Sequence, residues 1–101
     1  MPATGGFAGL LVVDLHFPQA QSLKDKRAFL RSIRATMRRA GFSMSEVAHH
    51  DKWQRSQIAV GIVAQRSNDV ERLLDEACAI CERVGCEAST KQRHVLSIDD
   101  F

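Results

Sequence analysis

Features that would tie this chain of 101 residues to a membrane or to secretion are scarce. Its three cysteines are odd in number and lack the spacing of a small secreted disulfide framework, which favours a reduced cytoplasm. No apolar run approaches the ~20 residues that span a bilayer, and the stretch from Phe7 to Val13 is short and followed by Asp14. We therefore expect a cytoplasmic protein with neither a signal peptide nor a membrane partner.

Motifs that specify a reaction are also missing. The sequence contains no glycine-rich phosphate loop, no nucleophile elbow and no paired-carboxylate arrangement. Cys78 and Cys81 have the spacing of a redox pair, but they fall in the last two turns of an expected helix, where the dipole opposes thiolate formation. We expect buried structural thiols, because Cys81 falls on the core stripe and Cys78 flanks it. A zinc set completed by Cys86 and His94 would need an unfavourable geometry. The expectation is a non-enzymatic protein with no cofactor and no metal.

Positive charge, by contrast, is concentrated in one segment. Half of the 14 Lys and Arg side chains lie between Ser22 and Ala40. They are Lys24, Lys26, Arg27, Arg31, Arg34, Arg38 and Arg39, and the only acid among them is Asp25. Residues 1–50 carry seven cations and three acids, whereas residues 51–101 carry seven cations and nine acids. This asymmetry indicates an anionic partner, and RNA is the partner that we expect.

An N-cap at Ser22, with Asp25 as the capping-box acid, and a terminal Gly41 mark the first of two predicted helices. Its apolar stripe consists of Leu23, Leu30, Ile33, Met37 and Ala40. Gly9 and the glycines before it are expected to form a flexible start. Apolar alternation then predicts strands at residues 10–17, 42–48, 57–65 and 86–96.

The second helix is expected to begin at Ser67 or Asn68, with Glu71 completing the capping box, and to end at Gly85. Its apolar stripe is Val70, Leu73, Leu74, Ala77, Ile80, Cys81 and Val84. The resulting β-α-β-β-α-β order predicts an α+β, ferredoxin-like sandwich, in which two helices cover one face of a four-stranded antiparallel sheet. We expect a single domain over residues 1–101, with an ordered core at about 9–96.

The first helix carries a basic stripe on its flank, formed at spacings of three and four residues by Lys24, Arg27, Arg31, Arg34 and Arg38. This stripe lies about 120° from the centre of the apolar stripe, so it reaches solvent beside the core. A row of guanidinium groups matches the phosphates of a nucleic-acid backbone. The alternative is a solvated face balanced by the acidic second helix, which would pack beside the first.

The predicted topology gathers three distant segments at one edge of the sheet. They are the end of the first strand (16–18), the start of the first helix (22–26) and the turn at 49–55. Trp53 and Arg55 in that turn could stack on or clamp a nucleic acid. For Trp53 alone, however, the favoured interpretation is an indole that plugs the end of the core.

A polar cluster is expected at the same edge, formed by His16, His49, His50, Asp51 and Gln54. A metal site or a general acid–base pair is conceivable there. Adjacent His49 and His50 cannot both face one way on a strand, which argues against a metal. Hydrogen bonding within the turn, or contact with an anionic ligand, is the favoured role.

Two motifs distinguish the sequence, namely Ser22-Leu23-Lys24-Asp25-Lys26-Arg27 and the run EVAHHDKWQR from Glu46 to Arg55. Together they resemble the YlxP-like family of small bacterial cytoplasmic proteins of unknown function. The resemblance extends from about Gly9 to Leu96 and implies a ferredoxin-like fold. Genes of that family often lie among translation-initiation and ribosome-maturation genes, which implies a connection with RNA or the ribosome. It implies no activity, because the family has none established.

We expect an RNA- or ribosome-associated module without enzymatic activity. Its predicted contacts are Lys24, Lys26, Arg27, Arg31, Arg34 and Arg38 on phosphates, with Trp53 and Arg55 at the edge. The rival is a homodimer through the open sheet face, using Leu10, Val12, Ala59, Gly61 and Val63 beside Asp14, His16, Gln57 and Gln65. A small enzyme that binds a phosphorylated metabolite is the third alternative.

Overall fold

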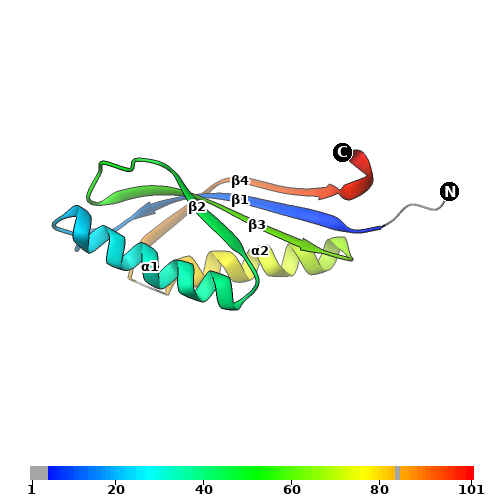
Figure 1. The fold of residues 1–101 in the computed structure, drawn as a ribbon, viewed down its shortest axis with the longest axis horizontal. Helices are drawn as coiled ribbons and strands as arrows, with labels where there is room; N and C mark the ends of the chain where they lie inside the picture. Colours follow the sequence, from blue (N-terminus) through cyan, green and yellow to red (C-terminus); the bar gives the residue numbers. More distant parts are fainter. Residues whose placement is uncertain (1–4, 84) are drawn as a thin grey trace.

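Two strand–helix–strand units build the fold in the computed structural model, which describes residues 5–83 and 85–101. The elements are β1 (Phe7–His16), α1 (Leu23–Arg39), β2 (Ser43–Ala48), β3 (Arg55–Ala64), α2 (Ser67–Glu82) and β4 (Glu87–Ser97), followed by the 3-10 helix η1 (Ile98–Asp100) (Figure 1). This order confirms the predicted β-α-β-β-α-β pattern.

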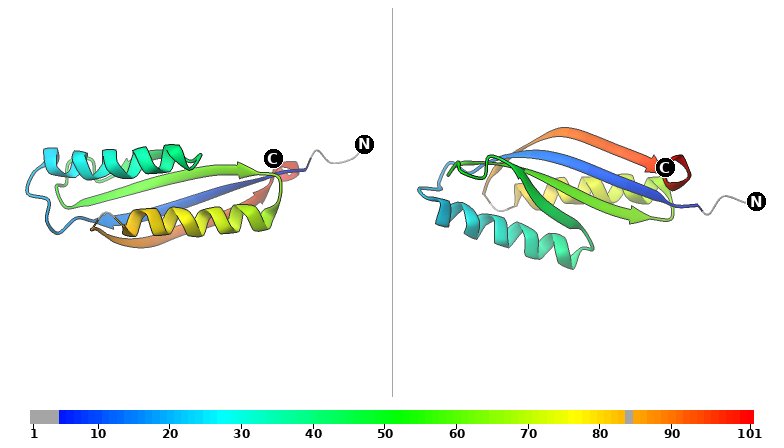
Figure 2. Two further views of the ribbon diagram at one scale, coloured as in Figure 1. Left: turned by 90° about the horizontal axis from the view of Figure 1, so that it is seen from below. Right: turned by 45° about the horizontal axis from the view of Figure 1, so that its top comes forward.

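The four strands form one antiparallel sheet in the order β2-β3-β1-β4. β3 returns between β1 and β2, with Val13 opposite Ile58. Both helices lie on the same face of the sheet and leave the other face open (Figure 2). The predicted ferredoxin-like sandwich is thereby confirmed. Neither helix in the described part of the chain combines the length and hydrophobicity of a transmembrane segment.

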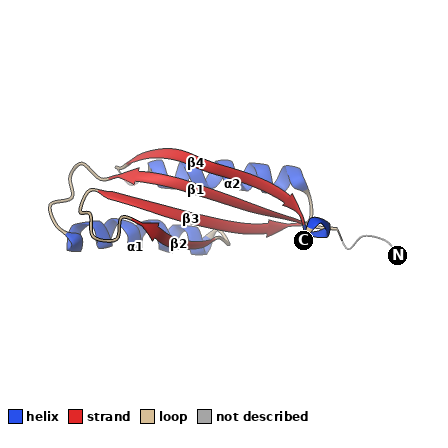
Figure 3. Ribbon diagram, turned by 90° about the horizontal axis from the view of Figure 1, so that it is seen from above, coloured by secondary structure: helices blue, strands red, loops and turns tan. Residues whose placement is uncertain are grey.

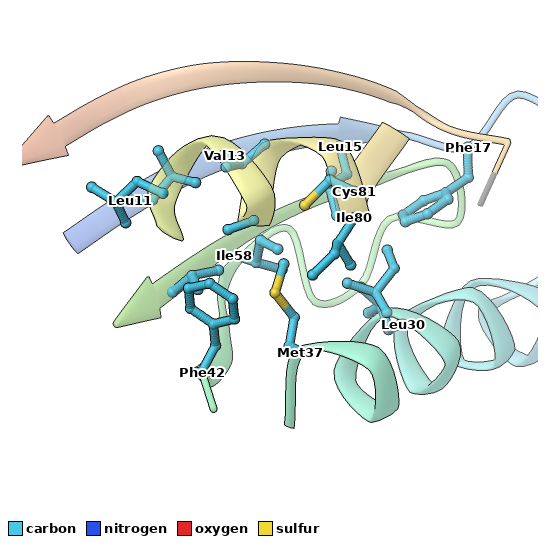
Figure 4. Close-up of a cluster of buried hydrophobic side chains, with 14 of the residues drawn as sticks. Leu11, Val13, Leu15, Phe17, Leu30, Met37, Phe42, Ile58, Ile80 and Cys81 are labelled. Atoms are coloured by element: carbon cyan, nitrogen blue, oxygen red, sulfur yellow. The ribbon is translucent and has the colours of Figure 1, made fainter. Parts of the chain in front are cut away.

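The core lies between the sheet and the two helices (Figure 4). Leu11, Val13 and Leu15 alternate along β1 and are at most 1% exposed. The helices contribute Leu30, Ile33 and Met37 from α1 and Val70, Leu74, Ala77, Ile80 and Cys81 from α2. Because successive strand residues point to opposite faces, Asp14 and His16 lie on the open face.

The ends of α1 are those that the sequence predicts. Ser22 Oγ accepts a hydrogen bond from the backbone N–H of Asp25 at 3.0 Å, and the Asp25 carboxylate accepts one from the N–H of Gln21 at 2.9 Å. Gly41 follows the C-cap Ala40 with a φ of 91°. That left-handed conformation suits glycine and ends the helix before β2.

β1 begins earlier than predicted and contains Gly9. A Cβ atom on Gly9 would lie 2.5 Å from Cγ1 of Val70, so α2 packs directly against the backbone of β1. The prediction of a flexible start at Gly9 is wrong, because a residue without a side chain adds nothing to hydrophobic periodicity.

α2 departs from its predicted start. Arg66 is the N-cap, and no side chain at that position caps the helix. The prediction of a Ser67 or Asn68 cap with Glu71 in a capping box is therefore wrong, because the helix follows β3 so closely that Ser67 is already helical. Val84 of the predicted apolar stripe lies outside the described residues.

Candidate nucleic-acid interface

Four exposed arginines lie along the flank of α1 that faces β2. We call Arg27, Arg31, Arg34 and Arg38 the arginine row. Two hollows place the row against β2: one of about 330 Å³ lined by Arg27, Leu30, Arg31, Arg34 and Glu46, and one of about 300 Å³ lined by Arg34, Arg38, Phe42, Ser43 and Met44. Arg34 lines both, and we call the two hollows together the α1–β2 groove. Figure 3 shows α1 and β2 side by side at one edge of the molecule.

The arginine row is missing from the ion pairs of the described residues. Within residues 5–83 and 85–101, neither its guanidinium groups nor the ammonium of Lys24 form an ion pair. Two acids of α2 are engaged elsewhere, since Glu71 and Asp75 lie 3.6 and 2.9 Å from the guanidinium of Arg93 on β4. The alternative of a solvated face balanced by the acidic second helix stays open, because the arginine row is exposed and the absence of ion pairs does not exclude a face that only meets water. The charge of the row is uncompensated by contact.

Lys26 is not part of this exposed surface. Its side chain is buried, with the residue 1% exposed. Nζ donates to the carbonyl oxygens of His49, His50 and Arg55 at 2.8, 3.3 and 3.2 Å, and it lies 3.1 Å from Oε2 of Glu46. The prediction that Lys26 contacts phosphate is wrong, because its ammonium binds the loop between β2 and β3 instead. We call residues 49–54 the hairpin loop.

The negative charge of Glu46, which lines the groove, is balanced by the ammonium group of Lys26. Ser56 Oγ donates to Glu46 Oε2 at 2.6 Å. Burial alone would raise the pKa of this carboxyl group, but the hydrogen bonds from Ser56 and Lys26 and the charge of Lys26 outweigh it, so the pKa lies below its ordinary value of 4.5. The carboxylate is thus ionised and paired with Lys26, not with the arginine row.

The hairpin loop is tied to the segment between β1 and α1. The N–H of Phe17 donates to the carbonyl oxygen of Gln54 at 2.7 Å. Gln54 Nε2 donates to the carbonyl oxygens of Pro18 and Ala20 at 3.2 and 3.0 Å. Together with the hydrogen bonds from Lys26, these contacts confirm that the three predicted segments meet at one edge.

Trp53 projects from the hairpin loop into solvent. It is 56% exposed. The interpretation of Trp53 as a plug for the core is wrong, because Phe17 fills that end of the core and stacks on Phe29 with ring centroids 5.2 Å apart. An exposed indole is available for stacking on a flat ligand.

The histidines of the predicted edge cluster do not converge. His16 Nδ1 lies 3.1 Å from Glu87 Oε2 on the open sheet face, whereas His50 Nε2 lies 3.2 Å from the carbonyl oxygen of Glu46. His49 has a φ of 65° in the turn. In the described ranges, no group of three or more His, Cys, Asp or Glu side chains could hold a metal ion. His50 and Gln54 do form hydrogen bonds, but their partners lie outside the turn, in β2 and in the segment between β1 and α1.

Arg55 lies apart from the arginine row. Arg55 is opposite His16 in the register of β1 and β3. With Asp14 and Glu87 it lines a hollow of about 340 Å³ on the open face, whereas the row lies on the helix side. Asp51 is exposed in the hairpin loop. The structure therefore separates the Arg55 side chain from the arginine row.

The three cysteines are free thiols. Cys81 is fully buried, and burial raises its pKa to about 12. Burial also raises the pKa of Cys86, whose thiol donates to the carbonyl oxygen of Cys81 at 2.8 Å. Cys78 is partly buried, with Sγ 3.7 Å from Thr90 Oγ1. The expected structural role is confirmed for Cys81, because a buried thiol with a high pKa is a poor nucleophile.

Two residues of the site escaped the sequence reasoning, Glu46 and Ser56. Glu46 occupies the inward-facing phase of β2, in alternation with the exposed Ser45 and Val47. A carboxylate at an inward position requires a cation or several hydrogen-bond donors. That requirement was the available signal for its pairing with Lys26.

A model of the family described as "Protein of unknown function (DUF503)" matches residues 8–94. The expectation of a family without known function is confirmed, and the narrower resemblance to YlxP-like proteins stays a prediction. No curated protein matches the chain in sequence.

Two solved structures share the fold. One is a C-terminal segment of the alpha subunit of aIF2 from Pyrococcus abyssi, with a TM-score of 0.56, 12% identity, and coverage of 91% of this chain and 53% of that chain. The other is the YXEP protein of Bacillus subtilis, a dinuclear metal binding peptidase from the M20 family, with a TM-score of 0.56, 10% identity, and coverage of 89% and 27%. The chain thus spans about half of the first structure and a smaller part of the second. At these identities the likeness concerns the fold alone.

Proposed function

This chain belongs to the DUF503 family of proteins of unknown function, and we propose that it is a non-enzymatic RNA-binding protein of the cytoplasm that associates with RNA or the ribosome. The arginine row, extended by Lys24, holds the phosphate backbone. Trp53 is exposed in the hairpin loop, which Lys26 joins to the first turns of α1, and it stacks on a base. Lys26 and Arg55 are not among the contacts, because Lys26 is buried and Arg55 lines the open sheet face.

The observation that carries this proposal is the uncompensated charge of the row. Neighbouring cations three and four residues apart repel each other and weaken a helix. Nearby acids could relieve that repulsion, yet Glu46 is paired with Lys26, and Glu71 and Asp75 are paired with Arg93. An anion from outside the molecule would supply the missing countercharge.

Phosphates in series are the anion that fits the row best. From Arg27 to Arg38 the row extends about 16 Å along the helix axis, so it presents several binding positions in a line. Each guanidinium group offers a planar fork that matches a phosphate. The exposed indole of Trp53 adds a group that can stack on a base, which a simple polyanion lacks.

Reversing the charge of the row tests the proposal. The triple variant with Arg27→Glu, Arg31→Glu and Arg34→Glu should lose RNA binding at moderate salt. In the wild type, the logarithm of the binding constant should fall linearly with the logarithm of the salt concentration. Loss of three phosphate contacts should make this slope less steep, by about 2 to 3. Fluorescence anisotropy of a labelled RNA measures both quantities.

The matched control reverses three exposed arginines associated with α2, namely Arg66, Arg72 and Arg83, each to Glu. It makes the same change in net charge, so binding should persist if location matters more than total charge. Circular dichroism confirms that both variants fold. Equal loss of binding in the two variants, or retention of RNA by the folded row variant, contradicts the proposal.

A homodimer through the open sheet face is the second candidate, favoured by the apolar half of that face. Leu10, Val63 and Leu96 are 39%, 68% and 42% exposed there. Register aligns Ala8 with both Val63 and Leu96, so these side chains share one end of the face. Burial against a second copy would remove them from water.

Sedimentation over a range of protein concentrations tests the dimer, with nuclease added to exclude assembly on RNA. A dimer formed through this face should dissociate when Leu10 and Val63 are both changed to Lys. Trp53→Ala is the control, because it removes an exposed aromatic group of the hairpin loop and should leave the dimer intact. A monomer at all concentrations rejects this candidate.

A further inference from the structure

We infer that the RNA is bound as a single strand whose backbone follows the α1–β2 groove and whose base stacks on Trp53. This inference rests on the proposed function and adds to it the form of the RNA and the path that it takes. It follows from the shape of the groove, the location of the indole and the way the hairpin loop is held.

The groove combines cations with apolar surface on a small scale. Its two hollows measure about 330 and 300 Å³, at the lower end of the range for small-molecule pockets. Leu30, Phe42 and Met44 line them beside the arginine row. A ribose or an unpaired base can enter such hollows, whereas a duplex presents its phosphates on a rigid, wide cylinder and can touch the row only from outside.

The hairpin loop that carries Trp53 is joined to the Arg27 end of α1. Lys26, which precedes Arg27 in α1, donates to the carbonyl oxygens of His49 and His50 in the hairpin loop. The loop is therefore tied to the first turns of α1, and Figures 1 and 3 show the loop and the start of α1 at the same end of the molecule. An indole in that loop can receive a base from a strand whose phosphates continue along the row.

Stacking on Trp53 selects for unpaired bases. In a duplex both faces of each internal base are covered by neighbouring base pairs, so no face is free for the indole. A single strand exposes its bases, and aromatic side chains bind them with little dependence on sequence. Trp53 is 56% exposed and its loop is fixed by Lys26 and Gln54, so the indole needs little rearrangement to accept a base.

The experiment compares three probes at the same low salt concentration: a single-stranded oligouridylate, a blunt RNA duplex of equal length and inorganic polyphosphate. Trp53 is the only tryptophan, so its emission reports stacking directly. We expect the single strand to bind and quench that emission. The duplex should bind at least about tenfold more weakly and without quenching, and polyphosphate should bind without quenching.

Two substitutions separate stacking from charge, with binding followed by anisotropy of a labelled oligouridylate. Trp53→Ala should weaken single-strand binding roughly 5- to 100-fold, whereas Trp53→Phe should retain most of the affinity. Neither change should alter duplex binding. Urea unfolding of both variants checks that the fold is intact.

Failure of the inference and failure of the proposed function give different results. The inference is overturned if the duplex binds as tightly as the single strand, or if the single strand binds without a change in Trp53 emission. The proposed function still stands in that case if Arg27→Glu, Arg31→Glu and Arg34→Glu together abolish binding. Absence of binding by every RNA at low salt overturns both.

Discussion

The buried ammonium group of Lys26 joins the first turn of α1 to the hairpin loop that carries Trp53. It has three carbonyl acceptors and one carboxylate within 3.3 Å. Burial of a charge is favourable only when it is paired and hydrogen-bonded, and Lys26 meets both conditions. At the scale of the single residue, a cation that sequence reasoning assigned to the ligand therefore organises the surface instead.

Replacement of Lys26 should destabilise the protein strongly. Lys26→Met leaves the Glu46 carboxylate, which is 16% exposed, without its cation, and removes the donor of three carbonyl groups. The expected loss is about 3–5 kcal/mol in the free energy of unfolding, measured with urea. The exposed neighbour Arg27 changed to Met is the control and should shift stability by no more than about 0.5 kcal/mol. A similar effect of both substitutions contradicts the assignment.

The same pair predicts a pH dependence of stability. The folded-state pKa of Glu46 lies below its ordinary value of 4.5, so the unfolded chain takes up its proton first as the pH falls. Its stabilising contribution is complete above the unfolded pKa and is lost as the pH falls through the folded pKa. Urea midpoints should show a gap between wild type and Glu46→Gln at pH 7 that shrinks in this acid range. A gap that stays constant down to pH 3 rejects the prediction.

At the scale of the elements, apolar periodicity and helix end signals were sufficient for the order of strands and helices. Ser22 and Gly41 bound α1 as predicted, because their roles depend on local backbone geometry. The start of α2 and the start of β1 were missed, because both depend on tertiary packing. Arg66 carries no capping side-chain oxygen, and Gly9 has no side chain to reveal its direction.

Substitution by alanine should destabilise the protein at Gly9 but not at Gly61. The Cβ of Gly9→Ala would meet Val70 at 2.5 Å and both Ile62 and Leu74 at 3.2 Å, so α2 has to shift away from the sheet. The expected cost is about 1–3 kcal/mol in the free energy of unfolding. In Gly61→Ala the nearest atom lies 3.9 Å away, so the variant should gain about 0.4–1 kcal/mol from reduced chain entropy. Effects of the same sign in urea unfolding would contradict the proposed close packing.

At the scale of the whole molecule, the candidate site arises from how charges are distributed across the sheet. The basic stripe was visible in the sequence, because helical spacing determines which side chains share a flank. That the nearby acids pair with other cations was not visible, since the packing of helices on the sheet decides that Glu71 and Asp75 lie near Arg93 and that Glu46 lies beside Lys26. Trp53 was assigned to the core for the same reason, because Phe17 closes that end only in three dimensions.

The segregation of charge predicts how stability responds to salt. The formal net charge is only +2, so repulsion over the whole molecule is weak and repulsion along the arginine row dominates. Sodium chloride screens that repulsion, and the melting temperature should rise by a few degrees between low and moderate salt. Polyphosphate should raise it at much lower concentration, because it binds only the folded row.

A matched pair of double variants shows whether the row is the source of this response. Arg31→Gln with Arg34→Gln removes the central repulsion, so this variant should melt above the wild type at low salt and respond less to added salt. Arg66→Gln with Arg83→Gln makes the same change in net charge at the ends of α2 and should keep the wild-type response. If both variants respond alike, the effect depends on total charge, and the row is not an unsatisfied anion site. If only the first variant loses the response, the charges of α1 carry a repulsion that a bound polyanion would relieve.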